Sequence, residues 1–321
     1  MRLLQLSGAV LLSGLFSGLL WQLGAPTTLR AQEKNIPPSQ NSDRVTFVAY
    51  NLKNYLAMDR RVKGEVRKAA PKPENEIAAL MEGLRAMNPD ILGVCEIGDP
   101  SYLADFQARL KKVGVDLPNT ELVRAKSGFD RNLALLTRFP IVATHSNDTY
   151  TYQIGKQKLP FQRGVLDVTI ALNPQYHLRC VGLHLKSKRP VPEAPEAEMR
   201  LNEARLARQH IDRILEEEPG TNLLVYGDFN DLRIEPPVRT LQGRFGRHDY
   251  LSALTLSDQY GFKWTHCWSY ADSYSRFDFV LRSKGLVPEI DREHSHIYHW
   301  KNWDKASDHR PLVVSIIAKD Q

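Results

Sequence analysis

Cysteine is scarce in this chain, which has three in 321 residues, at positions 95, 180 and 267. Three cysteines do not make a disulfide framework, and they leave at most one bridge open. Cys95 and Cys180 lie inside apolar runs, ILGVCEI and LRCVGLHL, and we expect them to be small core residues. No zinc-ligand spacing is present. The fold must therefore rest on its hydrophobic core.

Several other signatures are missing. The sequence contains no glycine-rich phosphate loop, no serine-centred nucleophile elbow, no internal repeat and no low-complexity block. These absences argue against P-loop nucleotide binding, against serine hydrolysis of the α/β type and against a repeat architecture. What remains is an ordinary globular composition, with 25% charged and 42% hydrophobic residues.

The first residues have their own composition. Met1 and Arg2 make a short positive start, residues 3–25 carry no charge, and Leu29-Arg30-Ala31 precedes Gln32. This pattern predicts a signal peptide at residues 1–31 and an exported protein, periplasmic or secreted. The apolar stretch is also roughly long enough to span a bilayer, so an uncleaved N-terminal membrane anchor is the alternative. Residues 32–43 are polar, contain proline and are predicted to form a flexible linker.

The net charge is mildly positive. Of the formal +6, two charges come from Arg2 and Arg30 in the leader, which leaves +4 for the remainder. This permits an anionic partner without requiring one. Six basic residues are clustered against one acid within residues 60–72, namely Arg60, Arg61, Lys63, Arg67, Lys68 and Lys72. We expect a solvated loop there, with contact to a phosphate backbone as the alternative.

Apolar runs and helical periodicity outline the elements after residue 43. Strands are expected at residues 45–51, 90–96, 132–136, 164–172, 177–185, 223–226, 277–281 and 312–317. Helices are expected at residues 74–87, 102–113 and 193–218. Short strands with fewer helices between them favour an α/β two-sheet sandwich over a regular βαβ repeat.

The segment LLVYGDFND, residues 223–231, is the most informative part of the chain. An apolar strand ends there and presents Asp228 and Asn230, which alternation places on the same face. A carboxylate beside a neutral amide suits a phosphate, because one group can activate water and the other can donate hydrogen bonds without repelling the anion. Alone the signal is weak, since Gly-Asp is also an ordinary turn.

Polar residues recur at the ends of other apolar strands. They are Asn51, Glu96, His184, Asp278, and Asp308 with His309. Each has an ordinary explanation as a turn residue, a helix cap, a salt-bridge partner or a packed histidine. Strand ends are held rigidly by the sheet and commonly carry ligands for a reaction. So many together indicate an active site.

The order of YNL, VCEI, HLKSK, GDFND, RFDFV and SDHRPL resembles the endonuclease/exonuclease/phosphatase superfamily, which has the deoxyribonuclease I-like fold. SDHRPL and GDFND are its most specific pieces. The resemblance implies one domain over residues 44–318, built as a four-layer α/β (α+β) sandwich of two mixed sheets flanked by helices. It also implies hydrolysis of phosphoester bonds with a divalent cation, usually Mg²⁺, with Mn²⁺ or Ca²⁺ as alternatives.

The resemblance assigns metal binding to three residues. Glu96 matches the metal-binding glutamate, Asn51 would orient the metal or its water, and Asp308 would lie close to the metal. Mg²⁺ prefers a few carboxylate oxygens and keeps most of its waters, which agrees with so small a ligand set.

Five further residues receive catalytic roles from the resemblance. His309 would contact the scissile phosphate or activate water, and Asp278 would hold its imidazole in one tautomer. Asp228 would orient or deprotonate the attacking water, and Asn230 would donate to a phosphoryl oxygen. His184 matches a position that stabilises the phosphate or the leaving group. Whether Asp228 or His309 is the base stays open, since both would share one coupled site.

His184 also bears on the substrate, because abasic-site endonucleases of the superfamily have a tyrosine there. The chain looks closer to deoxyribonuclease I, sphingomyelinases and inositol-polyphosphate phosphatases. The HLKSK element is similar to that of secreted bacterial nucleases, so Lys186 and Lys188 are predicted to bind substrate, as are Arg131 and Asn132. A solvated basic turn is the alternative for the lysines.

These observations predict an exported nuclease acting on DNA or RNA. The alternatives are an enzyme acting on a small or lipid phosphoester and a non-catalytic binding protein on the same fold. Among the aromatic residues near the C-terminus, Phe262 and Trp264 are expected in the core, and Trp300 and Trp303 at the surface. No motif indicates an obligate protein partner.

Overall fold

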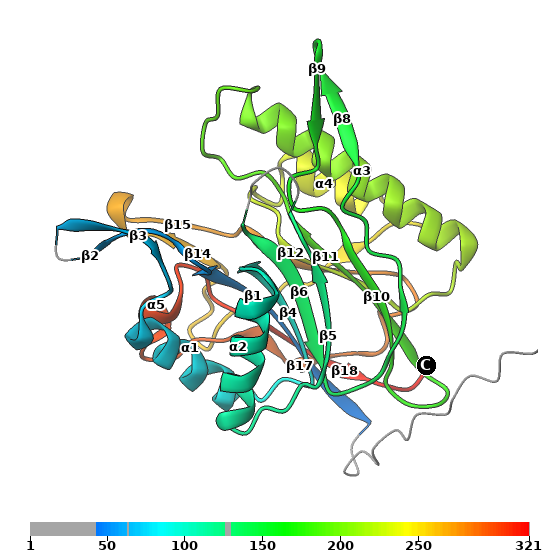
Figure 1. Ribbon diagram of the computed structural model, residues 1–321. Coiled ribbons are helices and arrows are strands. Elements are labelled where there is room, and N and C mark those ends of the chain that lie inside the picture. Colours follow the sequence, from blue (N-terminus) through cyan, green and yellow to red (C-terminus); the bar gives the residue numbers. More distant parts are fainter. Residues whose placement is uncertain (1–42, 63, 126–129, 321) are drawn as a thin grey trace, which may run out of the picture. The chain divides into compact units, whose positions relative to one another are not determined.

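The computed structural model describes residues 43–62, 64–125 and 130–320 (Figure 1). The predicted leader, residues 1–31, and all of the predicted linker except Asp43 lie outside this part of the chain. None of the helices in the described ranges is both long and apolar enough to cross a membrane.

The first sheet has six strands in the order β17-β18-β1-β4-β6-β5. Its members are β1 (Arg44–Tyr55), β4 (Ile91–Ile97), β5 (Asn119–Val123), β6 (Asn132–Thr137), β17 (Ile290–Ile297) and β18 (Leu312–Ile317). Strands β1 and β4 are parallel, and the other neighbours are antiparallel. The sheet is therefore mixed.

The second sheet also has six strands, in the order β13-β16-β12-β11-β10-β7. Its members are β7 (Ile141–Thr144), β10 (Leu166–Ala171), β11 (His177–His184), β12 (Leu223–Asp228), β13 (Ser252–Ala253) and β16 (Asp278–Arg282). Here β11 and β12 form the parallel pair. The two sheets thus share one design, a central parallel pair with antiparallel neighbours.

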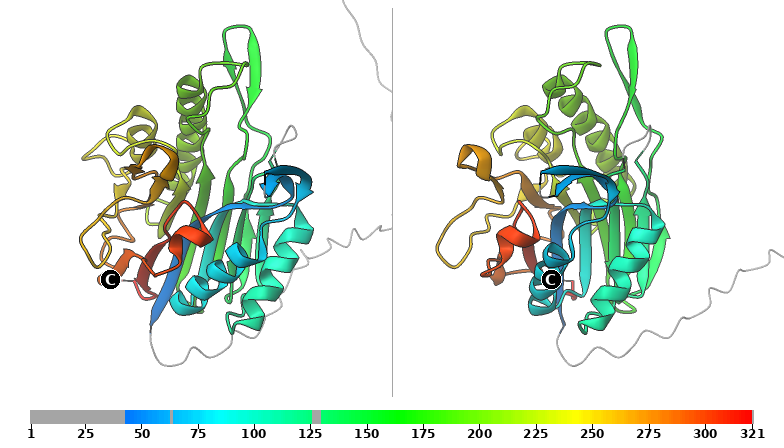
Figure 2. Two further views of the ribbon diagram at one scale, coloured as in Figure 1. Left: turned by 90° about the vertical axis from the view of Figure 1, so that its left-hand side faces the viewer. Right: turned by 60° about the vertical axis from the view of Figure 1, so that its left-hand side comes forward.

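Three hydrophobic clusters hold the layers together. The central cluster joins the two sheets, for example Phe47 and Leu135 with Val168 and Leu224. Helices α1 (Glu74–Met87) and α2 (Pro100–Lys112) cover the outer face of the first sheet. Helices α3 (Glu196–Glu217) and α4 (Pro236–Gln242) cover the second (Figure 2). The predicted four-layer sandwich of mixed sheets is confirmed.

One tyrosine fixes the spacing between the sheets at the centre. The ring of Tyr226, on β12, packs edge-on against Phe47 at 4.9 Å between centroids. A Cβ at Gly93, on β4, would lie 2.1 Å from the same ring. Only glycine leaves room for this aromatic contact across the core, because closely packed interiors have no slack to absorb such an overlap.

The predicted strands and helices are all present, with shifted ends. Helix α2 begins two residues before its predicted start, because Asp99 caps it and Pro100 occupies its first turn. The Asp99 carboxylate accepts hydrogen bonds from the backbone N of Ser101 and Tyr102. Capping therefore falls to Asp99, which frees Glu96 from the ordinary explanation that it caps this helix.

Three exposed hairpins have no counterpart among the predicted elements. They are β2 (Met58–Val62) with β3 (Glu65–Ala70), β8 (Thr151–Ile154) with β9 (Gln157–Pro160), and β14 (His266–Trp268) with β15 (Ser273–Ser275). None of their sequences alternates regularly between apolar and polar residues, because little of each hairpin packs on the hydrophobic core. The basic stretch, expected as a loop, is thus a hairpin, and its Lys72 is buried against Glu76 beyond β3.

The expectation for the aromatic residues is wrong at two positions. Phe262, expected in the core, is 56% exposed, whereas Trp300, expected at the surface, is buried beside α1. Trp303, on the short helix α5 (Trp303–Ala306), packs partly against the same cluster. The polar neighbours of Trp300 in sequence lie outside the cluster that holds its ring, and sequence alone cannot show this.

Candidate active site

The polar strand ends meet where the two sheets adjoin. The parallel pairs bring Asn51 beside Cys95 on one sheet and His184 beside Asp228 on the other. The amide of Asn51 then donates to Asp228 across the gap, at 3.1 Å. The positions predicted from separate parts of the sequence are therefore joined in one place.

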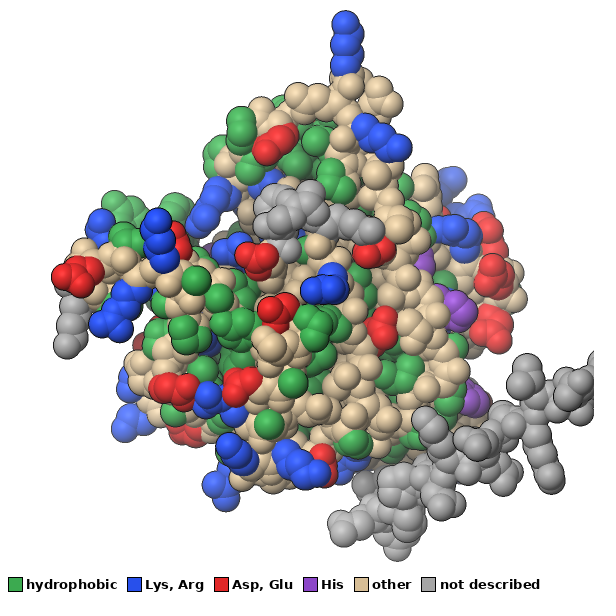
Figure 3. Space-filling model, in the orientation of Figure 1, with side chains coloured by type: hydrophobic (Ala, Val, Ile, Leu, Met, Phe, Trp, Pro, Cys, Tyr) green, Lys and Arg blue, Asp and Glu red, His purple; other side chains and the backbone are tan. Residues whose placement is uncertain are grey.

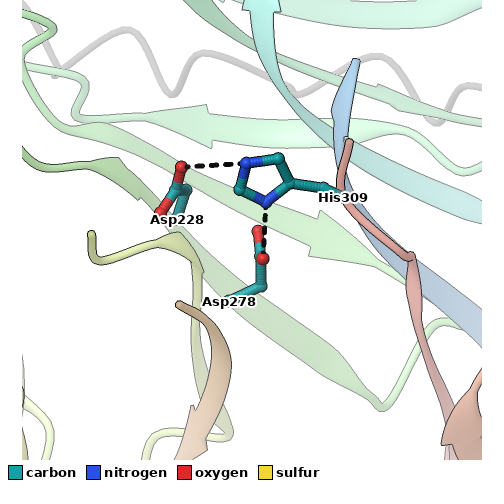
Figure 4. Close-up of side chains that lie close together, drawn as sticks. All are labelled: Asp228, Asp278 and His309. Atoms are coloured by element: carbon teal, nitrogen blue, oxygen red, sulfur yellow. Dashed lines mark hydrogen bonds and ion pairs between the residues drawn. The ribbon is translucent and has the colours of Figure 1, made fainter. Parts of the chain in front are cut away.

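An Asp–His–Asp arrangement forms the centre of the site (Figure 4). His309 Nδ1 lies 2.7 Å from Asp278 Oδ2, and Nε2 lies 3.7 Å from Asp228 Oδ2. Asp278 begins β16 and Asp228 ends β12, where the two residues face each other in antiparallel register. His309 precedes β18 of the other sheet. The hydrogen bond to Asp278 fixes the ring and leaves Nε2 facing Asp228.

Burial and charge set the protonation of this group. Burial alone would lower the pKa of His309, but the carboxylates of Asp278 and Asp228 raise it to about 10. Burial raises the pKa of Asp228 to about 7, with the charge on His309 acting against the shift. His184 is different, because burial and then Arg163 and His309 hold its pKa well below the usual histidine range. The site thus pairs a charged imidazole with a neutral one.

The backbone is strained around the site. Glu96 and Asn230 have φ angles of 64° and 52°, a left-handed conformation that non-glycine residues rarely adopt. Lys53 and Asn54 share it, so four of the seven such residues in the described ranges lie here. Each costs about 1–3 kcal/mol, and strain of this kind concentrates at functional sites. It turns the Glu96 side chain out of the strand pattern toward the cavity.

A set of oxygen atoms suits a hard divalent cation. One Glu96 oxygen accepts from the backbone N of Asn54 at 2.9 Å, and the other lies 3.9 Å from His184 Nε2. The side-chain oxygen of Asn54 is buried without a hydrogen-bond partner. With Asp308, these residues line one cavity. Carboxylate and amide oxygens are what Mg²⁺ and Ca²⁺ prefer, so this donor set fits such an ion.

Asn51 connects the oxygen donors around Glu96 to the Asp–His–Asp group. Its side-chain oxygen accepts from the backbone N of Lys53 at 3.0 Å while its amide donates to Asp228. It therefore couples the segment holding Asn54 to the Asp–His–Asp group.

Asp228, Asp278 and His309 also offer ligand atoms within 4.8 Å of one another. Because Asp278 already occupies His309 Nδ1, we interpret this trio as a hydrogen-bonded proton relay. The other ring nitrogen of His309, Nε2, faces Asp228. We therefore treat the oxygen atoms around Glu96 as the candidate metal site.

The cavity has a volume of about 820 Å³. Nine predicted residues line it, namely Glu96, Arg131, His184, Lys186, Lys188, Asp228, Asn230, Asp308 and His309. Asn51, Asn132 and Asp278 do not belong to the lining. Asn132, predicted to bind substrate, uses both ends of its side chain on the backbone, donating to Gly98 and accepting from Ala125. It holds the segment after Glu96 in place.

One buried carboxylate positions the basic wall of the cavity. Glu203, on α3, accepts from the backbone N of Lys186 at 2.6 Å and from that of Gln162 at 3.1 Å. The ammonium of Lys186 donates to the carbonyls of Ser187 and Arg189. Lys188 pairs with Asp231 at 2.6 Å. Glu203 of α3 therefore holds the backbone of the basic segment that begins at Lys186.

A sequence profile of the endonuclease/exonuclease/phosphatase family matches residues 49–309. The chain belongs to this family. The match covers every predicted catalytic and metal-binding position. A search among curated protein sequences found no match.

Solved structures of family members have the same fold. A family protein from Leptotrichia buccalis is 15% identical, with a TM-score of 0.58 over 85% of this chain and 99% of the other. The human Nocturnin catalytic domain with a bound sulfate is 17% identical, with a TM-score of 0.58 over 85% and 94%. ANGEL2, a 2′,3′-cyclic phosphatase, is 13% identical, with a TM-score of 0.58 over 85% and 94%. Identities this low establish the fold of the family alone.

Thirteen residues of the cavity lie outside the set predicted from sequence, among them Asn54, Arg163, His266 and Trp268. Asn54 had a detectable signal, since it follows Asn51 closely in NLKN and asparagine is favoured in left-handed conformations. His266 had none. It reaches the site because β14 forms a bridge that pairs it with His309.

Proposed function

We propose that the protein is an exported, Mg²⁺-dependent phosphodiesterase that hydrolyses DNA or RNA. The observation that carries the proposal is one cavity lined both by His309 and Asp228, with Asp278 holding His309 from outside the lining, and by the oxygen donors around Glu96. Family membership supports phosphoester hydrolysis as the reaction. Export rests on the predicted leader.

Each polar group has a task toward a bound phosphodiester. Glu96 and Asp308 would hold the cation, which would supply positive charge to polarise a phosphoryl oxygen and to lower the pKa of a water. His309 presents Nε2 to the cavity as a proton carrier, because Nδ1 is engaged by Asp278. Asp228 lies within reach of that nitrogen to take or orient the proton of the attacking water.

Asn230 and His184 complete the phosphate site. One hydrogen of the Asn230 amide is used by the carbonyl of Leu185, at 3.0 Å, which leaves the second for a phosphoryl oxygen. His184, kept neutral by burial, can donate a hydrogen bond without adding charge. Such fixed donors favour a transition state in which negative charge grows on oxygen.

Positive charge around the cavity supports a polyanionic substrate. Arg131, Lys186, Lys188 and Arg189 belong to its lining. Figure 3 shows further Lys and Arg side chains over the β2–β3 hairpin at the left of the view. In that hairpin Arg61, Arg67 and Lys68 are exposed. A nucleic acid backbone can use charges spread this widely, whereas a small phosphoester can meet only a few of them.

Hydrolysis assays test the reaction and the substrate together. The protein is offered plasmid DNA, single-stranded DNA, RNA, sphingomyelin and inositol phosphates with Mg²⁺, Mn²⁺, Ca²⁺ or EDTA. We expect EDTA-sensitive cleavage of nucleic acid, with KM rising about tenfold or more between 50 and 200 mM salt, since neutralised phosphates release counterions. Turnover confined to a lipid or small phosphoester would keep the proposed chemistry and show that nucleic acid is not the substrate. No turnover at all would favour a binding protein.

Export is tested by sequencing the N-terminus of the protein recovered from the cells that make it. We expect the mature chain to start at or near Gln32, because Ala31 directly precedes it and the uncharged apolar stretch ends a few residues earlier, as at signal-peptide cleavage sites. A chain that starts at Met1 and fractionates with membranes would instead establish the N-terminal anchor.

A further inference from the structure

Two exposed aromatic side chains stand together on the β14–β15 hairpin. Trp268, at the end of β14, is 56% exposed, and Tyr270, in the 3₁₀ turn η1 (Ser269–Ala271), is 90% exposed. Their rings are stacked, with centroids 6.2 Å apart and planes 29° apart. Single exposed aromatic residues are common on protein surfaces, whereas a stacked, exposed pair beside a cavity is a candidate surface for contact with a ligand. We call Trp268 and Tyr270 the aromatic platform.

The platform is fixed to the catalytic segment. The backbone N of Cys267 donates to the carbonyl of Asp308 at 2.8 Å, and His266 pairs with His309. His266 and Trp268 are two residues apart on β14, so they lie on one face of the strand, and both line the cavity. Two residues of strand span about 7 Å, which places Trp268 within one nucleotide of the phosphate that His309 would contact.

The hairpin is polar apart from its aromatic rings. Ser269, Asp272 and Ser273 surround the platform, and Asp272 adopts a left-handed conformation at the turn. A hairpin that entered a lipid bilayer would have to bury this carboxylate, at a cost of several kcal/mol. The same cavity is lined by Arg131 and Arg189, which suit a phosphate backbone. Aromatic faces beside cations are the pattern by which proteins hold unpaired nucleotides.

We propose that Trp268 and Tyr270 form a stacking site for an unpaired base next to the scissile phosphate. The site would select single-stranded or frayed nucleic acid, because the faces of bases within a duplex are covered by their neighbours. This inference rests on the proposed nuclease function and narrows its substrate.

Binding measured in EDTA tests the stacking site without hydrolysis. Fluorescence anisotropy with a single-stranded oligonucleotide and a matched hairpin duplex would compare the full-length protein with Trp268→Ala and Tyr270→Ala. Stacking contributes about 1–3 kcal/mol per base, so each variant should bind the single strand about 5- to 150-fold more weakly and the duplex almost unchanged. Trp268→Phe should recover most of the affinity, because a smaller ring still stacks.

Tyr260→Ala is the matched control. Tyr260 is 66% exposed, packs edge-on against His299 and does not line the cavity, so its loss should leave oligonucleotide binding unchanged. Wild-type affinity of both platform variants for the single strand would overturn the stacking site while leaving nuclease activity to be judged by the hydrolysis assays. Loss of binding to sphingomyelin vesicles in the variants, with oligonucleotide binding intact, would overturn it in favour of a lipid surface.

Discussion

Replacing His309 by alanine is expected to lower kcat/KM for phosphodiester hydrolysis by about 10²- to 10⁴-fold. Within the described ranges, the imidazole is the only side chain with an ion pair to both Asp278 and Asp228, so its loss removes the proposed proton carrier and leaves two buried carboxylates facing each other. Initial rates with a nucleic acid substrate at saturating Mg²⁺ measure the effect. His177→Ala, at an exposed histidine on β11, is the matched control and should retain full activity.

Asp278→Asn provides the internal check on this prediction. An amide cannot supply the charge that holds His309 protonated, so the pKa of the imidazole should fall from about 10 and the rate should drop by a comparable factor. If the two residues act as one unit, the double variant is no worse than His309→Ala alone. Independent, multiplying losses would show that Asp278 does not work through His309.

Replacing Glu96 by alanine should abolish metal-dependent turnover at millimolar Mg²⁺. Glu96 is one of two carboxylates in the predicted metal set, and Mg²⁺ is held by few protein ligands, so losing one should weaken binding by more than about 100-fold. Activity titrated with Mg²⁺ and Mn²⁺ binding followed by electron paramagnetic resonance give two separate measures. Glu216→Ala, at an exposed position on α3, controls for loss of a surface charge.

Full activity of the Glu96→Ala variant would remove Glu96 from the metal site. Rescue at high Mn²⁺ would support the assignment, since a cation that binds nitrogen and oxygen sites more tightly tolerates a missing ligand better. Unchanged Mn²⁺ binding combined with lost turnover would mean that Glu96 orients the substrate or water and that Asp308 and Asn54 hold the ion.

The main strands and the candidate site could be predicted from sequence because both depend on local order. An apolar run followed by a polar residue defines a strand end, and parallel neighbours such as β11 and β12 carry His184 and Asp228 to one edge. Asn54 and His266 do not follow from this rule, although Asn54 has a weak signal of its own in NLKN. Asn54 depends on an irregular stretch of β1, and His266 on a bridge to a distant segment.

The exposed hairpins and the burial of the aromatic side chains were harder to predict from the sequence, for a related reason. Apolar residues alternate along a strand only when one of its faces is buried. An exposed two-stranded element such as β14–β15 therefore shows no such pattern in the sequence. Hydrophobic side chains are equally ambiguous, because a ring can serve the core or a binding surface. Trp300 lies in a core cluster and Trp268 at the cavity, and only tertiary structure separates them.

The bond between Asn51 and Asp228 has a wider consequence. One partner comes from the first sheet and the other from the second, and His309 likewise reaches Asp278 across the same boundary. Neither half of the sandwich owns a complete set of reacting groups. A fragment, a nascent chain or a partly opened molecule therefore lacks a complete set of the proposed reacting groups, which come together only when the two sheets pack.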